Sequence, residues 1–122
     1  MQRVFFLLIS FVLVACGDSN NPAEFFGETA VRYEVLTGGC TASVTYENRS
    51  GNTEQRTVDN GWTYDFNAKS GAFLYVSAQN DCDSGGVSAN IYEFVDFEGY
   101  RLTETATSNG AFVIATASKK LD

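Results

Sequence analysis

The 122-residue sequence contains no histidine, one proline and only eight lysines and arginines, against fifteen aspartates and glutamates. The absence of histidine removes the commonest general base and the commonest zinc or copper ligand. The formal charge of −7 argues against nucleic acid and against anionic lipid headgroups, because both bind through lysine and arginine. The sequence also lacks a nucleophile elbow, a phosphate-binding loop and a dinucleotide fingerprint. These absences predict a protein that is not an enzyme and uses no cofactor or metal.

The first fifteen residues have the pattern of a secretory signal peptide. Met1–Arg3 carries one positive charge, and an apolar run from Val4 to Ala15, interrupted only by Ser10, follows it. This run is well short of the roughly 20 residues that a membrane-spanning helix needs. The residues at its end, Leu13-Val14-Ala15-Cys16, resemble the bacterial lipobox. The resemblance implies that Cys16 is lipidated and becomes the first residue after cleavage; an ordinary signal peptide with an incidental cysteine is the alternative.

The mature chain is predicted to contain a short tether and one folded domain. Gly17–Pro22 is polar and can bury nothing, so we expect residues 16–29 to form a flexible tether and residues 30–122 the domain. Gly17, rather than aspartate, follows Cys16, and the known sorting rule for lipoproteins then favours the outer membrane if the source is Gram-negative. We therefore expect a protein of the bacterial cell envelope, held at a membrane by the lipid on Cys16.

From Ala30 onward, apolar and polar residues alternate, as in the half-buried strand Val31, Tyr33 and Val35. Strands are expected near residues 31–35, 40–47, 54–58, 62–66, 72–78, 87–91, 100–106 and 111–117. About eight short strands without an amphipathic helix predict an all-β fold, an antiparallel β-sandwich of immunoglobulin-like type; a small β-barrel is the alternative.

Three of these strands carry more detailed expectations. The polar strand 54–58 is expected at a sheet edge, where charge discourages pairing with other chains. The apolar strand 72–78 is expected to be buried on both faces. Ser108-Asn109-Gly110 is expected to form a tight turn that joins the last two strands.

Six stretches of the domain share a pattern with a known family: Val31–Val35, Ala42–Asn48, Gly51–Gln55, Trp62, Phe73–Asn80 and Gly110–Ser118. Together they resemble the MmpS family, small membrane-anchored β-sandwich proteins that partner RND-type transporters in mycobacteria. The resemblance implies a non-catalytic accessory module whose partner is an envelope protein or transporter. That family is held by a transmembrane helix, whereas this chain has a lipobox. A structural or protective envelope lipoprotein without a specific partner is the alternative.

The three cysteines divide into one for lipidation and two for the domain. With Cys16 acylated, Cys40 and Cys82 remain, an even number in an exported domain. Cys40 begins one expected strand and Cys82 follows another, so both can lie at the same end of the sandwich. We predict a disulfide between them; two free buried thiols are the alternative.

Two patterns suggest ligand sites. In one loop, Asp81 and Asp83 occupy the first two ligand positions of an EF-hand, with Gly86 as its turn glycine. However, Gly85 stands where a third oxygen ligand is needed, and Glu93 is one residue late for the closing carboxylate. A glycine-rich strand connection is therefore favoured over a calcium site.

The second pattern is aromatic. Trp62, Tyr64 and Tyr75 would form a carbohydrate-binding platform if all three faced solvent on one side. At period-two spacing on strands, such residues more often pack in the core or at its rim. Packing is therefore the favoured interpretation.

The segment Ile91–Gly99 is longer than its counterpart in the MmpS pattern, and long connections on a rigid sandwich often carry binding. Unbroken pairing would send Glu93 inward and Tyr92 and Phe94 outward, and burying an unpaired carboxylate costs several kcal/mol. A β-bulge near Glu93 would turn it to solvent and return Phe94 to the core. Without the bulge, Tyr92 and Phe94, with Phe97, offer an exposed surface to a partner. Packing of both phenylalanines against the domain's own edge is the alternative.

Overall fold

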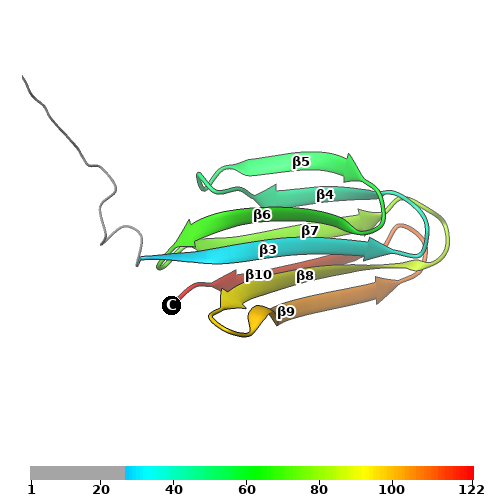
Figure 1. The fold of residues 1–122 in the computed structure, drawn as a ribbon. Helices are drawn as coiled ribbons and strands as arrows, with labels where there is room; N and C mark the ends of the chain where they lie inside the picture. Colours follow the sequence, from blue (N-terminus) through cyan, green and yellow to red (C-terminus); the bar gives the residue numbers. More distant parts are fainter. Residues whose placement is uncertain (1–26) are drawn as a thin grey trace, which may run out of the picture.

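The computed structural model describes residues 27–122, and this part of the chain forms eight β-strands and no helix (Figure 1). The strands are β3 (Glu28–Thr37), β4 (Ala42–Glu47), β5 (Thr53–Val58), β6 (Trp62–Lys69), β7 (Phe73–Asn80), β8 (Gly86–Val95), β9 (Gly99–Asn109) and β10 (Ile114–Lys120). The expected signal peptide, Cys16 and most of the expected tether lie outside the described residues. Within residues 27–122, no helix could cross a membrane.

The strands form two four-stranded antiparallel sheets, in the orders β10-β7-β4-β5 and β6-β3-β8-β9. The sheets lie face to face as an open sandwich (Figure 1). The predicted immunoglobulin-like sandwich is therefore confirmed, and the alternative of a barrel is wrong. The polar strand β5 lies at a sheet edge, as its composition predicted.

The core lies between the sheets and follows the period-two alternation of the sequence. Val31, Tyr33 and Val35 of β3 are completely buried, and Tyr46 of β4 faces them from the other sheet. The rings of Tyr33 and Tyr46 meet edge to face, 6.1 Å apart. The Tyr33 hydroxyl donates to the Glu47 carbonyl at 2.8 Å and accepts the Tyr75 amide at 3.2 Å. The buried Tyr33 hydroxyl thus makes two hydrogen bonds to the other sheet and its border, so no polar group of this side chain is left unpaired.

Four details of the fold differ from the expectations. β3 begins at Glu28, two residues inside the expected tether. β7 is buried on one face only, because Phe73, Tyr75, Ser77 and Gln79 lie on its outer face. β9 extends to Asn109, and β10 begins only at Ile114. β9 and β10 belong to different sheets, so the connection around residues 108–110 is not the tight hairpin turn expected.

The buried tyrosine makes the stability of the domain sensitive to alkali. Burial raises the pKa of Tyr33 well above its usual value, so at pH values above about 10 the unfolded chain loses this proton while the folded domain keeps it. The stabilisation is complete below the pKa that Tyr33 has in the unfolded chain. It is lost as the pH rises from there toward the higher pKa that Tyr33 has in the folded domain. We expect the urea midpoint to fall above about pH 10, with tyrosinate absorbance appearing as the domain unfolds. In Tyr33→Phe the fall should be smaller, and a wild-type midpoint that stays constant would contradict the argument.

Candidate functional site

The hairpin of β8 and β9 contains a β-bulge. Ile91 pairs with Glu104, but Tyr92 pairs with Leu102, so Thr103 is an extra residue on β9. The Thr103 hydroxyl donates to the Ile91 carbonyl at 3.2 Å. Because successive side chains face opposite sides of a sheet, one extra residue reverses the faces of all residues on the far side of it.

The position of the bulge corrects the expectation for Glu93. The bulge lies on β9, so β8 keeps an unbroken register with β3 and Glu93 pairs with Val31. Glu93 therefore faces inward and is not turned to solvent. Its carboxylate accepts from the ammonium group of Lys119 on β10 of the other sheet. This ion pair links the two sheets. It removes the free-energy cost of burying a carboxylate without a partner.

The bulge creates an exposed apolar surface on the outer side of β8 and β9. It turns Tyr100 and Leu102 to the same side as their partners Phe94 and Tyr92. Phe94 is 44% exposed and Leu102 is 48% exposed, while Phe97 is fully exposed in the turn between the strands. We call these five residues the aromatic surface.

The structure thus places the three predicted partner residues in different ways. Tyr92 and Phe94 lie on one face, and Phe94 does not return to the core. Its ring meets that of Tyr100 edge to face at 5.6 Å, so it packs partly on its own hairpin. Phe97 adopts a positive φ of 69°, a conformation uncommon for a residue with a large side chain, and projects at the tip.

One ion pair and one hydrogen bond to a carboxylate hold the side of the aromatic surface that borders β3. Arg32 makes a two-pronged ion pair with Asp65, at 2.7 and 2.9 Å, and its guanidinium lies 4.3 Å from the ring centre of Tyr100. The hydrogen bond from Arg32 holds the pKa of Asp65 below its usual value. The Tyr92 hydroxyl donates to Glu34 at 2.8 Å, and burial and this bond raise the Tyr92 pKa. Both rings are therefore held in place by charged neighbours while their edges remain accessible.

Tyr100 and Leu102 were not among the site residues that the sequence predicted. Their alternation in Tyr100-Arg101-Leu102 is visible in the sequence, but it does not say which face they share. That depends on the extra residue at Thr103, and only the pairing with β8 reveals it.

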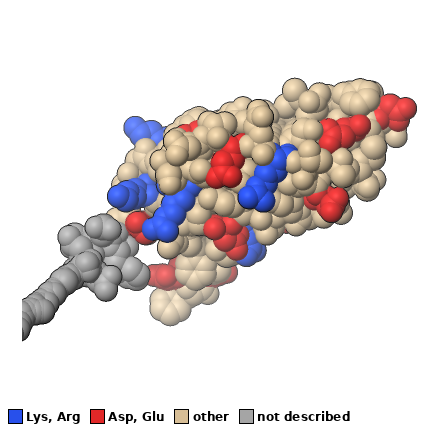
Figure 2. All heavy atoms as spheres, turned by 90° about the horizontal axis from the view of Figure 1, so that it is seen from above, with Lys and Arg blue, Asp and Glu red and all other residues tan. Residues whose placement is uncertain are grey.

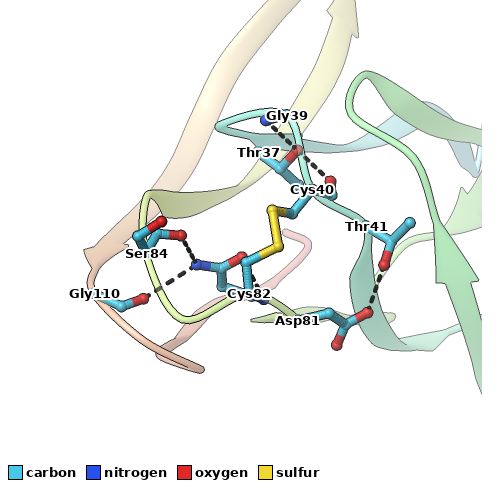
Figure 3. Close-up of a disulfide and its surroundings, with 9 residues drawn as sticks. Thr37, Gly39, Cys40, Thr41, Asp81, Cys82, Ser84 and Gly110 are labelled. Atoms are coloured by element: carbon cyan, nitrogen blue, oxygen red, sulfur yellow. Dashed lines mark hydrogen bonds between the residues drawn. A yellow bond between two sulfur atoms is a disulfide. The ribbon is translucent and has the colours of Figure 1, made fainter.

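The predicted disulfide between Cys40 and Cys82 is present, with the two Cα atoms 6.1 Å apart. It joins the connection before β4 to the connection after β7 at one end of the sandwich (Figure 3). Beside it, the buried amide of Asn80 donates to the carbonyls of Ser84 and Gly110, and its oxygen accepts the Cys82 amide. The sequence did not predict this network. It holds the connection between β7 and β8 in place.

The Asp81 carboxylate in this loop has polar partners of its own. It accepts from Thr41 at 2.9 Å (Figure 3) and from Ser43 at 2.8 Å. Within residues 27–122, no three acidic, histidine or cysteine residues gather as metal ligands. The loop therefore connects β7 to β8 with Asp81 tied back to β4 and to the residue before it.

The three aromatic residues of the suggested carbohydrate platform are separated. Trp62 and Tyr64 pack against the core residue Tyr46, with ring centres 5.2 and 4.9 Å away. Tyr75 instead lies on the outer face of the other sheet, stacked with Phe73. The three therefore form no common platform. The packing interpretation holds for Trp62 and Tyr64, whereas Tyr75 lies outside the core.

The fold is a small β-sandwich that carries the aromatic surface on the outer side of β8 and β9. No protein-family model matches the chain, and no curated protein matches it significantly. On the side of the domain seen in Figure 2, lysines and arginines lie beside acidic groups, and none gather into a continuous basic patch.

Proposed function

We propose that this protein is a non-catalytic binding module of the bacterial cell envelope, held at a membrane by the lipid on Cys16, which docks an envelope protein through its aromatic surface. The observation that carries the proposal is the outward display of Phe94, Leu102 and Phe97. Exposed apolar side chains gathered on one face are typical of protein interfaces. Aromatic residues with fixed rings also lose little conformational entropy on binding.

The place of the surface supports this role. Strand β3 begins at the end of the sandwich that also carries the turn between β8 and β9 (Figure 1). Residues 17–27 between the lipid and the domain reach at most about 40 Å when extended. A lipid on Cys16 would therefore hold the aromatic surface close to the membrane, where a membrane protein can meet it.

The charges around the surface favour a protein partner over the lipid itself. Acidic Asp96 and Glu98 flank Phe97 in the turn, and Glu98 pairs with Arg101. Such a tip offers no excess positive charge to anionic headgroups. The resemblance to the MmpS family supports a transporter as the partner.

The test is crosslinking in intact cells. A photoreactive residue introduced at Leu102 should capture a specific envelope protein in a background with native Phe94 and Phe97. In Phe94→Ser/Phe97→Ser this capture should fall at least tenfold, because loss of two large apolar contacts at an interface costs more than about 2 kcal/mol. The melting temperature should change little, because Phe97 is fully exposed and Phe94 lies outside the core and contacts only its own hairpin through Tyr100.

Phe112→Ser is the matched control, because Phe112 is a similarly exposed phenylalanine in the connection between β9 and β10. It should leave capture unchanged. Absence of any specific adduct, or equal loss in the control, would favour a structural lipoprotein without a partner. A melting temperature lowered by many degrees in the double variant would show that the phenylalanines serve packing.

A further inference from the structure

The outer face of the sheet β10-β7-β4-β5 carries an ordered array of uncharged polar side chains. In one cross-strand row Gln79, Ser43 and Thr57 are neighbours, and in the next row Ser77, Thr45 and Gln55 are neighbours. We call these six residues the hydroxyl–amide face. Strands lie about 4.8 Å apart and alternate residues about 6.7 Å apart, so the face presents a regular grid of hydroxyl and amide groups.

These side chains line a shallow groove of about 440 Å³ that extends over all four strands of the sheet. Of the residues that line the groove, Arg56 is the one with a charge and Ile114 is the one large exposed apolar residue. The outer face of the other sheet differs, because it carries the Arg32–Asp65 ion pair, Glu34 and the aromatic surface. The lining of the groove is thus nearly uncharged in a chain with a charge of −7, although Glu47 and Lys120 lie on the same face of the sheet and the Asp81 carboxylate accepts from Ser43.

Much hydrogen-bonding capacity on this face is free. Ser43 donates to Asp81, Ser77 bonds to Thr116, and Gln79 donates to the Phe112 carbonyl. Within residues 27–122, Thr45, Gln55 and Thr57 make no side-chain hydrogen bond that meets ordinary geometry. Each hydroxyl both donates and accepts, and each amide offers donors and an acceptor. The face therefore complements a ligand whose own groups also donate and accept.

We propose that the hydroxyl–amide face binds a neutral oligosaccharide. An anion would need more cations than Arg56 supplies, and an apolar ligand would leave the polar groups of the groove unpaired. A chain of sugar hydroxyls meets both requirements. Tyr75 lies next to Ser77 on the same face of β7 and stacks with Phe73, with ring centres 6.2 Å apart. Phe73 is 54% exposed, so this pair offers apolar ring surface to the C–H groups of a sugar that extends beyond the groove.

The test is titration calorimetry on the full chain in detergent, with hexa-N-acetylchitohexaose and maltohexaose as neutral probes and an oligogalacturonate hexamer as an acidic probe. We expect at least one neutral hexasaccharide to bind and the acidic one to bind at least tenfold more weakly. Thr45→Val with Gln55→Leu should weaken the binding at least tenfold, because each change removes hydrogen bonds while keeping the side-chain volume.

Thr63→Val is the matched control, because Thr63 is an exposed threonine on the outer face of β6 in the other sheet. It should bind the neutral sugar like the wild type. The proposal is overturned if neither neutral sugar binds at millimolar concentration, if the control weakens binding equally, or if the acidic sugar binds as tightly. Purified protein alone is used, so these outcomes do not depend on the partner of the aromatic surface.

Discussion

Replacing Cys40 and Cys82 together by alanine is expected to destabilise the domain by about 4 kcal/mol and to lower its melting temperature by roughly 15–30 °C. The disulfide closes a loop with a sequence separation of 42, and chain-entropy arguments assign about that energy to a loop of this length. The bridge also ties together the two connections at one end of the sandwich. A domain of about 95 residues has only a few kcal/mol to lose.

Thermal unfolding with and without reductant checks this expectation. The wild type should fall to the stability of the double alanine variant when reduced, while the variant should not respond to reductant. Thiol titration of the unfolded, unreduced domain should find neither cysteine free. Two titratable thiols there, or a melting temperature unaffected by reduction, would contradict the argument.

Replacing Cys16 by alanine is expected to move the protein out of the membrane fraction, or to leave it unprocessed with its signal peptide. The physical reason is that the proposed lipid on Cys16 would supply the membrane affinity, at about 0.8 kcal/mol for each buried methylene group. The acidic domain adds no electrostatic attraction to anionic lipids. Residues 27–122, which the structure describes, also contain no helix that could span a membrane.

Fractionation of cells and metabolic labelling with a fatty-acid analogue measure this effect. The wild type should be labelled and sediment with membranes, and Cys16→Ala should be unlabelled. The double alanine variant of Cys40 and Cys82 is a useful control, because it also loses cysteine thiols but keeps the lipidation site. A wild-type protein that remains unlabelled would end the lipoprotein interpretation.

The sequence was sufficient to predict an all-β fold and favoured a sandwich, because the alternation in Val31, Tyr33 and Val35 reports directly which side of a strand is buried. It left a barrel open, because strand count does not say whether the sheets close, and the sheet topology decided against it. The even number of cysteines left after Cys16, on the expectation of an exported domain, favoured the disulfide over two free thiols, and the structure contains it. The predicted strand boundaries were less accurate: β3 begins earlier and β10 later than the pattern predicted. Strand ends depend on which neighbour supplies hydrogen bonds, and that information is not local.

The candidate sites depend on pairing between strands, which the sequence alone does not specify. The alternation predicted that Glu93 would face inward unless a bulge intervened, but it could not place the bulge on β9 instead of β8. It could not supply Lys119 as the partner, which comes from the other sheet. Tyr100 and Leu102 lie on the same face as Tyr92 and Phe94 for the same reason. The register between β8 and β9 determines which face of the sheet each side chain occupies.

The sequence by itself determined the chemistry available to this protein: no histidine, an acidic surface, a lipobox-like segment ending at Cys16, and strands with one apolar side. Tertiary structure alone decided which side chains became neighbours. The aromatic surface exists because one extra residue, Thr103, reverses the faces of β9, and the hydroxyl–amide face exists because β4, β5 and β7 align their polar residues in rows. Both are consequences of cross-strand register, which is set by the hydrogen bonds of segments far apart in the chain.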